Sequence, residues 1–374
     1  MEFGYFAQTH VPKHEQVADP LAEHKRIMND LAMSVAIEEY GFKYVWASEH
    51  HFLDEYSHMS APEVFLSFVA ARTKKIHVGS AIINTTPPVN HPARIAEQVA
   101  MLDHLTDGRF EFGTGRGSST TEQGGFGIKD PNLTRDMWDE TITEFAKMWS
   151  QTDYSHDGTY FSMPQRNVLP KPNGASHPAM WVACGNPPTF EKAAKLGLGA
   201  FCFTLGAPKN ELAPLAKAYK SAIGSAQPVG EYVNDNLMCV SMLLCMEDRE
   251  EAFETAANIG SSYYQSLLFR YLDTFPRPAH VPAWPELLPP TTVEHVKMAL
   301  DAGMMAVGNP DDCAGVVQQF VDIGVDQLTF SPLTTTIPFE KARASMELFG
   351  REVLPRFDKD PVHRTTKMRQ AAKG

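Results

Sequence analysis

The amino-acid sequence predicts an α/β protein that folds as a (β/α)8 barrel with insertions. Short apolar segments alternate with longer segments whose apolar residues recur at helical spacing, and the first four strand–helix pairs follow one another directly. Crossovers between parallel strands are right-handed, and eight such units close into a barrel. Glu49, His50 and His51 directly follow an apolar strand, which is where a parallel α/β enzyme carries its active site.

Eight strands are expected, because eight short apolar segments occur in order along the chain. They cover residues 3–8, 45–47, 76–83, 109–113, 180–183, 200–203, 236–246 and 327–330. Helical spacing, proline or asparagine at helix starts and glycine after helix ends place the helices between these strands. The helices are expected at residues 23–40, 62–75, 91–105, 137–149, 211–222, 253–271, 311–323 and 339–354, with a further helix that begins after Asn186.

A single domain is expected over residues 1–355, with two additions to the barrel. Residues 153–167 place an Asp-Gly turn between aromatic residues, which predicts an inserted hairpin. Residues 273–290 contain six prolines and little periodicity, which predicts a long loop or lid. The polar and basic residues 356–374 are expected to form a solvated or disordered tail.

Composition excludes several classes of partner. The formal net charge of −12 argues against nucleic acid and against an anionic membrane surface. Neither a membrane-spanning apolar stretch nor a signal peptide at the N-terminus is predicted. Five scattered cysteines without a Cys-x-x-Cys pair indicate reduced thiols in a cytoplasmic protein.

The run Glu49-His50-His51 is the first candidate for chemistry. Successive side chains at a strand end point in alternate directions, so only one of the two histidines is expected to reach a pocket. The other strand ends offer no further ligands, so no metal site is expected. A histidine that transfers protons near neutral pH is the favoured function, and a structural cap at the strand end is the alternative.

Three further patterns fit a ligand but also have ordinary structural explanations. Alternating glycines at residues 112–117 surround Arg116, which can pair with a phosphate. Residues 183–189 include Cys184, Gly185, Asn186 and Thr189 at a helix start, where free N–H groups attract phosphate. The small residues Ser80 and Ala81 beside Ile82 could admit a flat ring. A surface arginine, a capped helix and ordinary core packing are the alternatives.

Several motifs recur together in order along nearly the whole chain. They are EEYGFKYVWASEHH at 38–51, ARTKKIHVGSA at 71–81, HPARIAE at 91–97, LDHLTDGRF at 102–110, FGTGRG at 112–117, VGNPDDC at 307–313 and GVDQL at 324–328. With these motifs the sequence resembles the bacterial luciferase-like family of flavin-dependent monooxygenases.

The resemblance implies a luciferase-like barrel that uses reduced flavin mononucleotide (FMN), delivered by a separate flavin reductase. It also implies that O2 is activated as a C4a-peroxide of the flavin. By position, His50 is then the general base or proton manager, with Glu49 and His51 in supporting roles. Arg116 binds the flavin phosphate, and Ala81–Ile82 forms a cis peptide under the flavin ring.

Two departures from the light-emitting subunit of luciferase are visible. Gly115 stands where that subunit has a reactive cysteine, and Cys184-Gly185 stands where it offers Glu-Ser to the phosphate. Neither light emission nor tight retention of the flavin is therefore expected.

The expected activity is oxygenation of a small apolar organic substrate, such as an aldehyde, ketone or terpene. Phe6, Trp46, Phe203 and the proline-rich segment are expected to form an aromatic pocket that excludes water. By resemblance, a homodimer is expected.

Two alternatives remain open. An F420-dependent oxidoreductase would transfer hydride on the same barrel, although the Glu49-His50-His51 run favours the monooxygenase. The second alternative is a non-catalytic flavin-binding partner subunit. The presence of both His50 and Arg116 argues against this alternative.

Overall fold

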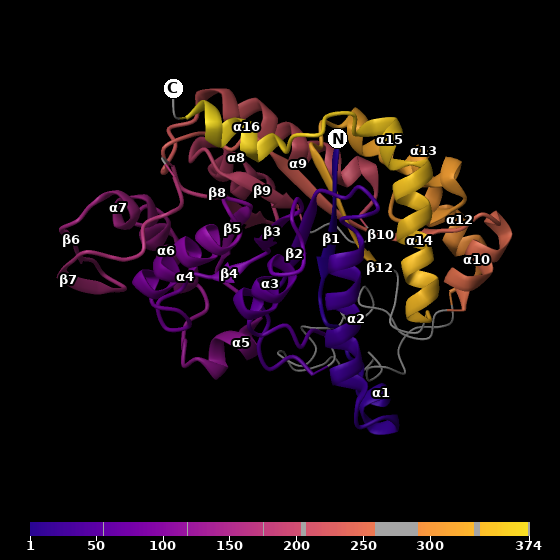
Figure 1. Ribbon diagram of the computed structural model, residues 1–374, viewed down its shortest axis with the longest axis horizontal. Coiled ribbons are helices and arrows are strands. Elements are labelled where there is room, and N and C mark those ends of the chain that lie inside the picture. The colour runs from indigo at the N-terminus through magenta and orange to yellow at the C-terminus, as the bar shows by residue number, and fades with distance from the viewer. Residues whose placement is uncertain are drawn as a thin grey trace.

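The computed structural model describes residues 1–54, 56–117, 119–174, 176–202, 207–258, 291–332 and 337–372. Within these ranges eight parallel strands close into a barrel, in the order β1-β2-β3-β5-β8-β9-β10-β12 and back to β1 (Figure 1). The strands are β1 (Glu2–Ala7), β2 (Tyr44–Ala47), β3 (His77–Ser80), β5 (Phe110–Gly115), β8 (Ala179–Cys184), β9 (Gly199–Cys202), β10 (Leu237–Cys245) and β12 (Gln327–Pro332). The predicted (β/α)8 barrel is confirmed.

Two short strands join the sheet beside the barrel strands. β4 (Ile83–Asn84) pairs with β5 directly after β3, so the expected strand over residues 76–83 is divided at Ala81 and Ile82. β11 (Ala306–Gly308) pairs in parallel with β10. Its three residues are too few for the apolar pattern to predict a strand.

Helices surround the barrel (Figure 1). They are α1 (Lys13–Ala18), α2 (Ala22–Ala36), α3 (Pro62–Ala70), α4 (Pro92–Leu105), α5 (Thr120–Gly125), α6 (Leu133–Ile142), α7 (Phe145–Ser150), α8 (Pro187–Lys195), α9 (Lys209–Ala222), α10 (Arg249–Ala257), α12 (Val293–Asp301), α13 (Pro310–Asp322), α14 (Phe339–Glu352), α15 (Leu354–Phe357) and α16 (Arg364–Ala371). Among the helices that the structure describes, none combines the length and hydrophobicity that crossing a membrane requires.

Large aromatic side chains fill the barrel interior. The ring of Trp46 lies 5.3 Å from that of Trp181 and 4.8 Å from that of Phe201, both edge-on. Gly79 provides the space for Trp46, because a Cβ at this glycine would lie 2.2 Å from the indole ring. Trp46 is fully buried in this core and does not line the pocket described below, so its prediction as a pocket residue is wrong. Phe203, the other aromatic residue predicted there, lies outside the described residues.

An antiparallel hairpin lies between α7 and β8. It consists of β6 (Tyr154–Asp157) and β7 (Ser162–Arg166), and the whole hairpin projects from the barrel (Figure 1). The carboxylate of Glu140 on α6 accepts hydrogen bonds from the backbone N–H groups of Thr159, Tyr160 and Phe161. The turn of the hairpin is thereby attached to the barrel. The proline-rich segment at 273–290 lies outside the described residues.

The C-terminal segment is folded, so the prediction of a solvated tail is wrong for residues 356–372. α16 lies at the same end of the molecule as the N-terminus (Figure 1). Arg369 donates two hydrogen bonds of 2.7 Å to Asp103, whose side chain is fully buried. Thr365 donates to Glu111 inside the barrel at 2.5 Å. A helix that packs against a protein core usually has an apolar stripe in its sequence. α16 is held by these polar contacts instead.

Glu111 and His77 form a buried hydrogen-bonded pair beneath α16. Oε1 of Glu111 lies 2.7 Å from Nδ1 of His77, and Trp181 donates to the other carboxyl oxygen. Burial raises the pKa of Glu111 to about 8, and burial lowers the pKa of His77 to about 3. Both groups are therefore uncharged at neutral pH, which avoids an ionised pair in the barrel interior.

Candidate active site

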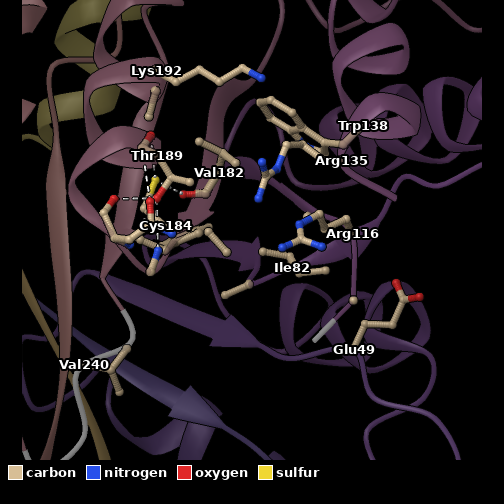
Figure 2. Close-up of a pocket in the computed structure, with 18 of the residues that line it drawn as sticks. Glu49, Ile82, Arg116, Arg135, Trp138, Val182, Cys184, Thr189, Lys192 and Val240 are labelled. Atoms are coloured by element: carbon tan, nitrogen blue, oxygen red, sulfur yellow. Dashed lines mark hydrogen bonds between the residues drawn. The ribbon is translucent and has the colours of Figure 1, made fainter. Parts of the chain in front are cut away.

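A pocket with a volume of about 370 Å³ lies at the C-terminal ends of the barrel strands, where (β/α)8 enzymes place their active sites (Figure 2). This volume is in the range of cofactor and substrate sites. The lining residues are Phe6, Glu49, His50, Tyr56, Ala81, Ile82, Gly115, Arg116, Gly117, Gln123, Arg135, Trp138, Asp139, Val182, Ala183, Cys184, Gly185, Asn186, Thr189, Lys192, Ala193, Phe201, Met238 and Val240. Of the catalytic, supporting and cofactor-binding residues predicted from the sequence, all except His51 line this pocket.

His50 is held in the pocket by Glu122. Nδ1 of His50 lies 3.0 Å from Oε1 of Glu122, and Tyr56 packs edge-on against the imidazole ring. Burial acts to raise the pKa of Glu122, but the nearby His50 and hydrogen bonds from His50, His51 and Ser119 outweigh it and lower the pKa. Glu122 is therefore an ionised acceptor, and it fixes the hydrogen on Nδ1 of the imidazole.

Glu49 and His51 support the strand end from the other side. Nε2 of His51 lies 3.0 Å from Oε1 of Glu49, and the His51 ring packs edge-on against Phe126. The Glu49 carboxylate also accepts the backbone N–H of Asn84 at 3.0 Å and the side-chain amide of Asn90 at 3.2 Å. Burial raises the pKa of Glu49, although these hydrogen bonds act in the opposite direction. Glu49 therefore connects the strand end to the loop after β4.

The Ala81–Ile82 peptide bond is cis and lies between β3 and β4. Both residues line the pocket. Gly115 faces Ile82, and a Cβ at Gly115 would lie 2.7 Å from the Ile82 side chain. Gly113 is equally constrained, because a Cβ there would lie 1.9 Å from the carbonyl oxygen of Ser80. The glycines of the 112–117 motif thus let β5 approach β3 and Ile82 closely, a requirement of packing within the protein.

Two arginines converge at one side of the pocket. Figure 2 shows the side chains of Arg116 and Arg135 pointing toward one another beside Trp138. The guanidinium of Arg116 donates to the hydroxyl of Thr134 at 2.9 Å. Two guanidinium groups that face one another repel, and a bound anion removes that repulsion. The arrangement fits a phosphate or another oxyanion.

Lys192 lies at the same rim but is already paired. Its ammonium forms an ion pair with Asp139 and lies 5.5 Å from the centre of the Trp138 ring. The pair joins α8 to α6 across the pocket edge. Because Asp139 offsets its charge, Lys192 contributes less to an anion site than the two arginines do.

The sequence predicts free N–H groups at the start of α8 that could bind a phosphate. This prediction is wrong, because these N–H groups have partners within the protein. Asn186 and Thr189 form a reciprocal capping box, in which the N–H of Thr189 bonds to the side chain of Asn186. The N–H groups of Gly185 and Asn186 both donate to the Thr189 hydroxyl at 3.2 Å. Pro187 and Pro188 have no N–H. The first turn therefore has no N–H group without a partner.

Cys184 is a neutral structural thiol. Its Sγ lies 3.4 Å from the carbonyl oxygen of Thr189, and burial raises its pKa to about 12. All five cysteines of the chain are free and buried. Reactivity at the pocket is not expected from a thiol that stays protonated.

Sequence reasoning missed Glu122, Arg135 and Gln123 as site residues. A signal for the first existed, because Ser119-Thr-Thr-Glu122 is a capping-box pattern, and both of its reciprocal hydrogen bonds are present at the start of α5. The same helix brings Gln123 to the pocket. No comparable local pattern identifies Arg135, because an arginine in the first turn of an amphipathic helix is common.

Comparison with known proteins identifies the family. A family profile described as luciferase-like monooxygenase matches residues 1–327. The chain belongs to this family. It is accordingly an oxidoreductase enzyme, and its barrel has the architecture of the luciferase-like monooxygenases.

Two proteins named as monooxygenases align with nearly the whole chain. The 4-hydroxyprotoasukamycin monooxygenase of Streptomyces nodosus subsp. asukaensis is 26% identical over 96% of this chain and 92% of that protein. The oxygenase component of the flavin-dependent trigonelline monooxygenase of Acinetobacter baylyi is 23% identical over 94% of this chain and 95% of that protein.

Solved structures of an FMN-binding and of an F420-binding enzyme share the fold. The oxygenating constituent of 3,6-diketocamphane monooxygenase from Pseudomonas putida, solved with FMN, matches with a TM-score of 0.73 at 19% identity. The match covers 95% of this chain and 98% of the solved chain. An F420-dependent secondary alcohol dehydrogenase matches with a TM-score of 0.70 at 16% identity, over 96% of this chain and 99% of its own.

Proposed function

We propose that this protein is a monooxygenase that uses reduced FMN and O2 to oxygenate a small apolar organic substrate, such as an aldehyde, ketone or terpene. The observation that carries the proposal is His50, backed by the ionised Glu122, in one pocket with the convergent pair Arg116 and Arg135. A proton-transferring group and an anion site thus share a cavity large enough for a cofactor and a small substrate.

The residues of the pocket fit FMN. Arg116 and Arg135 would hold the phosphate, and Ala81–Ile82 would lie against the flavin ring. Reduced FMN, when bound, would supply the electrons that activate O2. The start of α8 and Cys184 would line the cofactor site without donating hydrogen bonds to the phosphate. Their N–H groups and thiol already form hydrogen bonds within the protein.

His50 is suited to move a proton in this site. Because Glu122 holds the hydrogen on Nδ1, the neutral imidazole presents Nε2 as the atom that accepts a proton. Once protonated, the imidazolium is stabilised by the Glu122 carboxylate. A positioned acid–base group of this kind contributes about 10²–10⁴-fold to a proton-transfer step.

The apolar part of the lining supports an apolar substrate. Phe6, Phe201, Met238 and Val240 contribute from the strands, and Tyr56 lies beside His50. Such a lining binds the carbon skeleton of a substrate and keeps water from the reacting groups.

The proposal includes a flavin reductase as partner, because a relative is named as the oxygenase component of a flavin-dependent monooxygenase. It also includes a homodimer, supported by exposed apolar residues on neighbouring helices: Val64 and Phe68 on α3, and Met101 and Leu105 on α4. A cytoplasmic location is supported by the five free cysteines.

Turnover of a substrate panel tests the proposed function. Reduced FMN from an unrelated reductase, O2 and a set of aldehydes, ketones and terpenes are supplied to the wild type and to His50→Ala. We expect oxygenated product from the wild type and a loss of roughly 100-fold or more in His50→Ala. Oxygenation at the wild-type rate by His50→Ala would show that the role of His50 is wrong.

An F420-dependent oxidoreductase is the alternative function, because an F420-dependent dehydrogenase has the same fold. The two functions predict different results. Oxidation of a secondary alcohol with F420 in the absence of O2, without turnover on reduced FMN, would replace the monooxygenase proposal. Steady turnover by this chain with only a reductase added would exclude a non-catalytic partner subunit.

A further inference from the structure

The ion pair between Lys192 and Asp139 forms part of the wall of the pocket. Lys192 comes from α8 and Asp139 from α6, and both residues line the cavity. The side chain of Lys192 is 42% exposed to solvent and that of Asp139 is 36% exposed. Because both side chains border the cavity and also solvent, the pair separates the two. Trp138 beside them is buried and donates to Thr114 on β5 at 3.1 Å, which fixes this part of α6.

The Lys192–Asp139 pair lies beyond the proposed phosphate site, as seen from the proposed site of the flavin ring. Figure 2 shows the side chains of Arg116 and Arg135 between Ile82 on one side and Lys192 on the other. A ligand whose ring lies against Ile82 and whose phosphate lies between the arginines would therefore end in front of the ion pair.

The charges at this end of the pocket fit a phosphate that carries no further substituent. Arg116, Arg135 and Lys192 provide three cationic side chains, and Asp139 provides one carboxylate, so the net charge is positive. A phosphate monoester carries a charge of about −1.5 to −2 at pH 7. The corresponding phosphate of FAD or F420 carries one negative charge and a further substituent. In FAD a second phosphate and adenosine follow, and in F420 a tail with carboxylates follows.

We infer that the Lys192–Asp139 pair makes the site specific for a cofactor that ends in its phosphate, so that FMN binds and the longer cofactors FAD and F420 are excluded. The inference rests on the proposed function and names the residues that select FMN. A tail that leaves the arginine end between α6 and α8 would have to separate the ion pair. It would also move Lys192 away from the ring of Trp138. The Asp139 carboxylate would repel the anionic groups of either tail.

Binding of FMN and FAD tests this inference without turnover, because the two cofactors share one ring system. Dissociation constants for the oxidised cofactors are measured by fluorescence on the wild type and on the double variant Lys192→Ala/Asp139→Ala. We expect the wild type to bind FMN roughly 100-fold more tightly than FAD. F420 is measured in the same way.

The double variant removes one positive and one negative charge, so the net charge beside the arginines is unchanged. Its affinity for FMN should therefore stay within about threefold of the wild type. The wall between α6 and α8 is opened, and we expect the affinities for FAD and F420 to rise by roughly tenfold. A gain of affinity cannot result from misfolding of the variant.

The matched control is the double variant Lys195→Ala/Glu191→Ala. Lys195 and Glu191 form an exposed ion pair on α8 at 3.8 Å, and neither residue lines the pocket. This control also removes one charge of each sign from the same helix. It is expected to leave the preference for FMN over FAD unchanged.

Three results would overturn the inference. The first is a wild type that binds FMN and FAD equally well, which can be established even if the double variant does not fold. The second is a full preference for FMN in Lys192→Ala/Asp139→Ala, without a gain for FAD or F420. The third is an equal loss of preference in the control. A selective loss of preference in Lys192→Ala/Asp139→Ala, combined with a wild type that oxygenates no substrate, would contradict the proposed function and leave the inference standing.

Discussion

At the scale of single residues, the contact between His50 and Glu122 determines which nitrogen of the imidazole faces the chemistry. Glu122→Gln keeps the size of the side chain and removes its charge, so the imidazolium loses its stabilising partner. We expect kcat to fall by roughly 10- to 100-fold, with partial recovery in Glu122→Asp. Steady-state kinetics with saturating reduced FMN measures this, and an unchanged kcat in Glu122→Gln would refute the role of the pair.

Arg116 provides a second prediction at this scale. Arg116→Ala removes one of two guanidinium groups proposed to hold the FMN phosphate, so we expect the dissociation constant for FMN to rise by about 10- to 100-fold. Quenching of flavin fluorescence measures the constant. Arg94→Ala is the control, because Arg94 is an exposed arginine of α4 that pairs with Glu97 and does not line the pocket. Equal affinities in the two variants would contradict the assignment of the phosphate site.

The sequence predicted the location of single residues where a strand end decides it. His50 and His51 are adjacent, and alternation predicted that only one would reach the pocket, as found. Arg135 and Gln123 were not predictable, because they reach the pocket from α6 and α5 through the packing of those helices on the barrel. The start of α8 was misread, since the sequence does not show that Thr189 engages the N–H groups beside it.

At the scale of elements, the buried ion pair between Arg369 and Asp103 is one of the anchors of α16. Arg369→Met leaves the fully buried Asp103 carboxylate without its cation. We expect the free energy of unfolding to fall by about 3–5 kcal/mol, the usual cost of breaking a buried pair from one side. Urea unfolding measures the loss. Arg94→Met, which breaks the exposed pair with Glu97, should change stability little, and equal losses in both variants would argue against a docked α16.

Glu111 gives the stability of the barrel interior a defined pH dependence. Its pKa is about 8 when folded and near the ordinary value of 4.5 when unfolded, so the folded state holds a proton that the unfolded state releases. Wild-type stability should therefore fall relative to Glu111→Gln as pH rises from 7 to 8, by about 1 kcal/mol, and level off above pH 8. In this range His77 is neutral in the folded state.

Urea unfolding of the wild type and Glu111→Gln at pH 7, 8 and 9 measures this difference. Glu97→Gln, a change at an exposed carboxylate of α4, is the control and should show no such trend. A stability difference that stays constant or grows in favour of the wild type with rising pH would contradict the protonated, buried Glu111.

The elements also show what a sequence pattern can predict. The eight barrel strands were predictable because parallel strands buried on both faces are nearly continuous apolar runs. α16 was not, because its anchors are Thr365 and Arg369, and their partners Glu111 and Asp103 are more than 250 positions away in sequence. β11 was too short to show a pattern.

At the scale of the whole molecule, the exposed apolar residues of α3 and α4 predict the mode of association. Phe68→Glu replaces one of these exposed apolar residues with a charged one, so we expect a dimer in the wild type and a monomer in the variant. Analytical ultracentrifugation measures the mass. Val321→Glu on α13, another exposed apolar position, is the control and should remain dimeric. A wild-type monomer, or a dimer in both variants, would exclude this interface.

The proposal that the whole molecule is an oxygenase is tested most directly by isotope labelling. The protein is mixed with chemically reduced FMN, a substrate identified from the panel and ¹⁸O2, and the product is examined by mass spectrometry. We expect one labelled oxygen atom in each product molecule formed by the wild type and little labelled product from His50→Ala. A product without label, or a substrate converted equally well when O2 is absent, would contradict it.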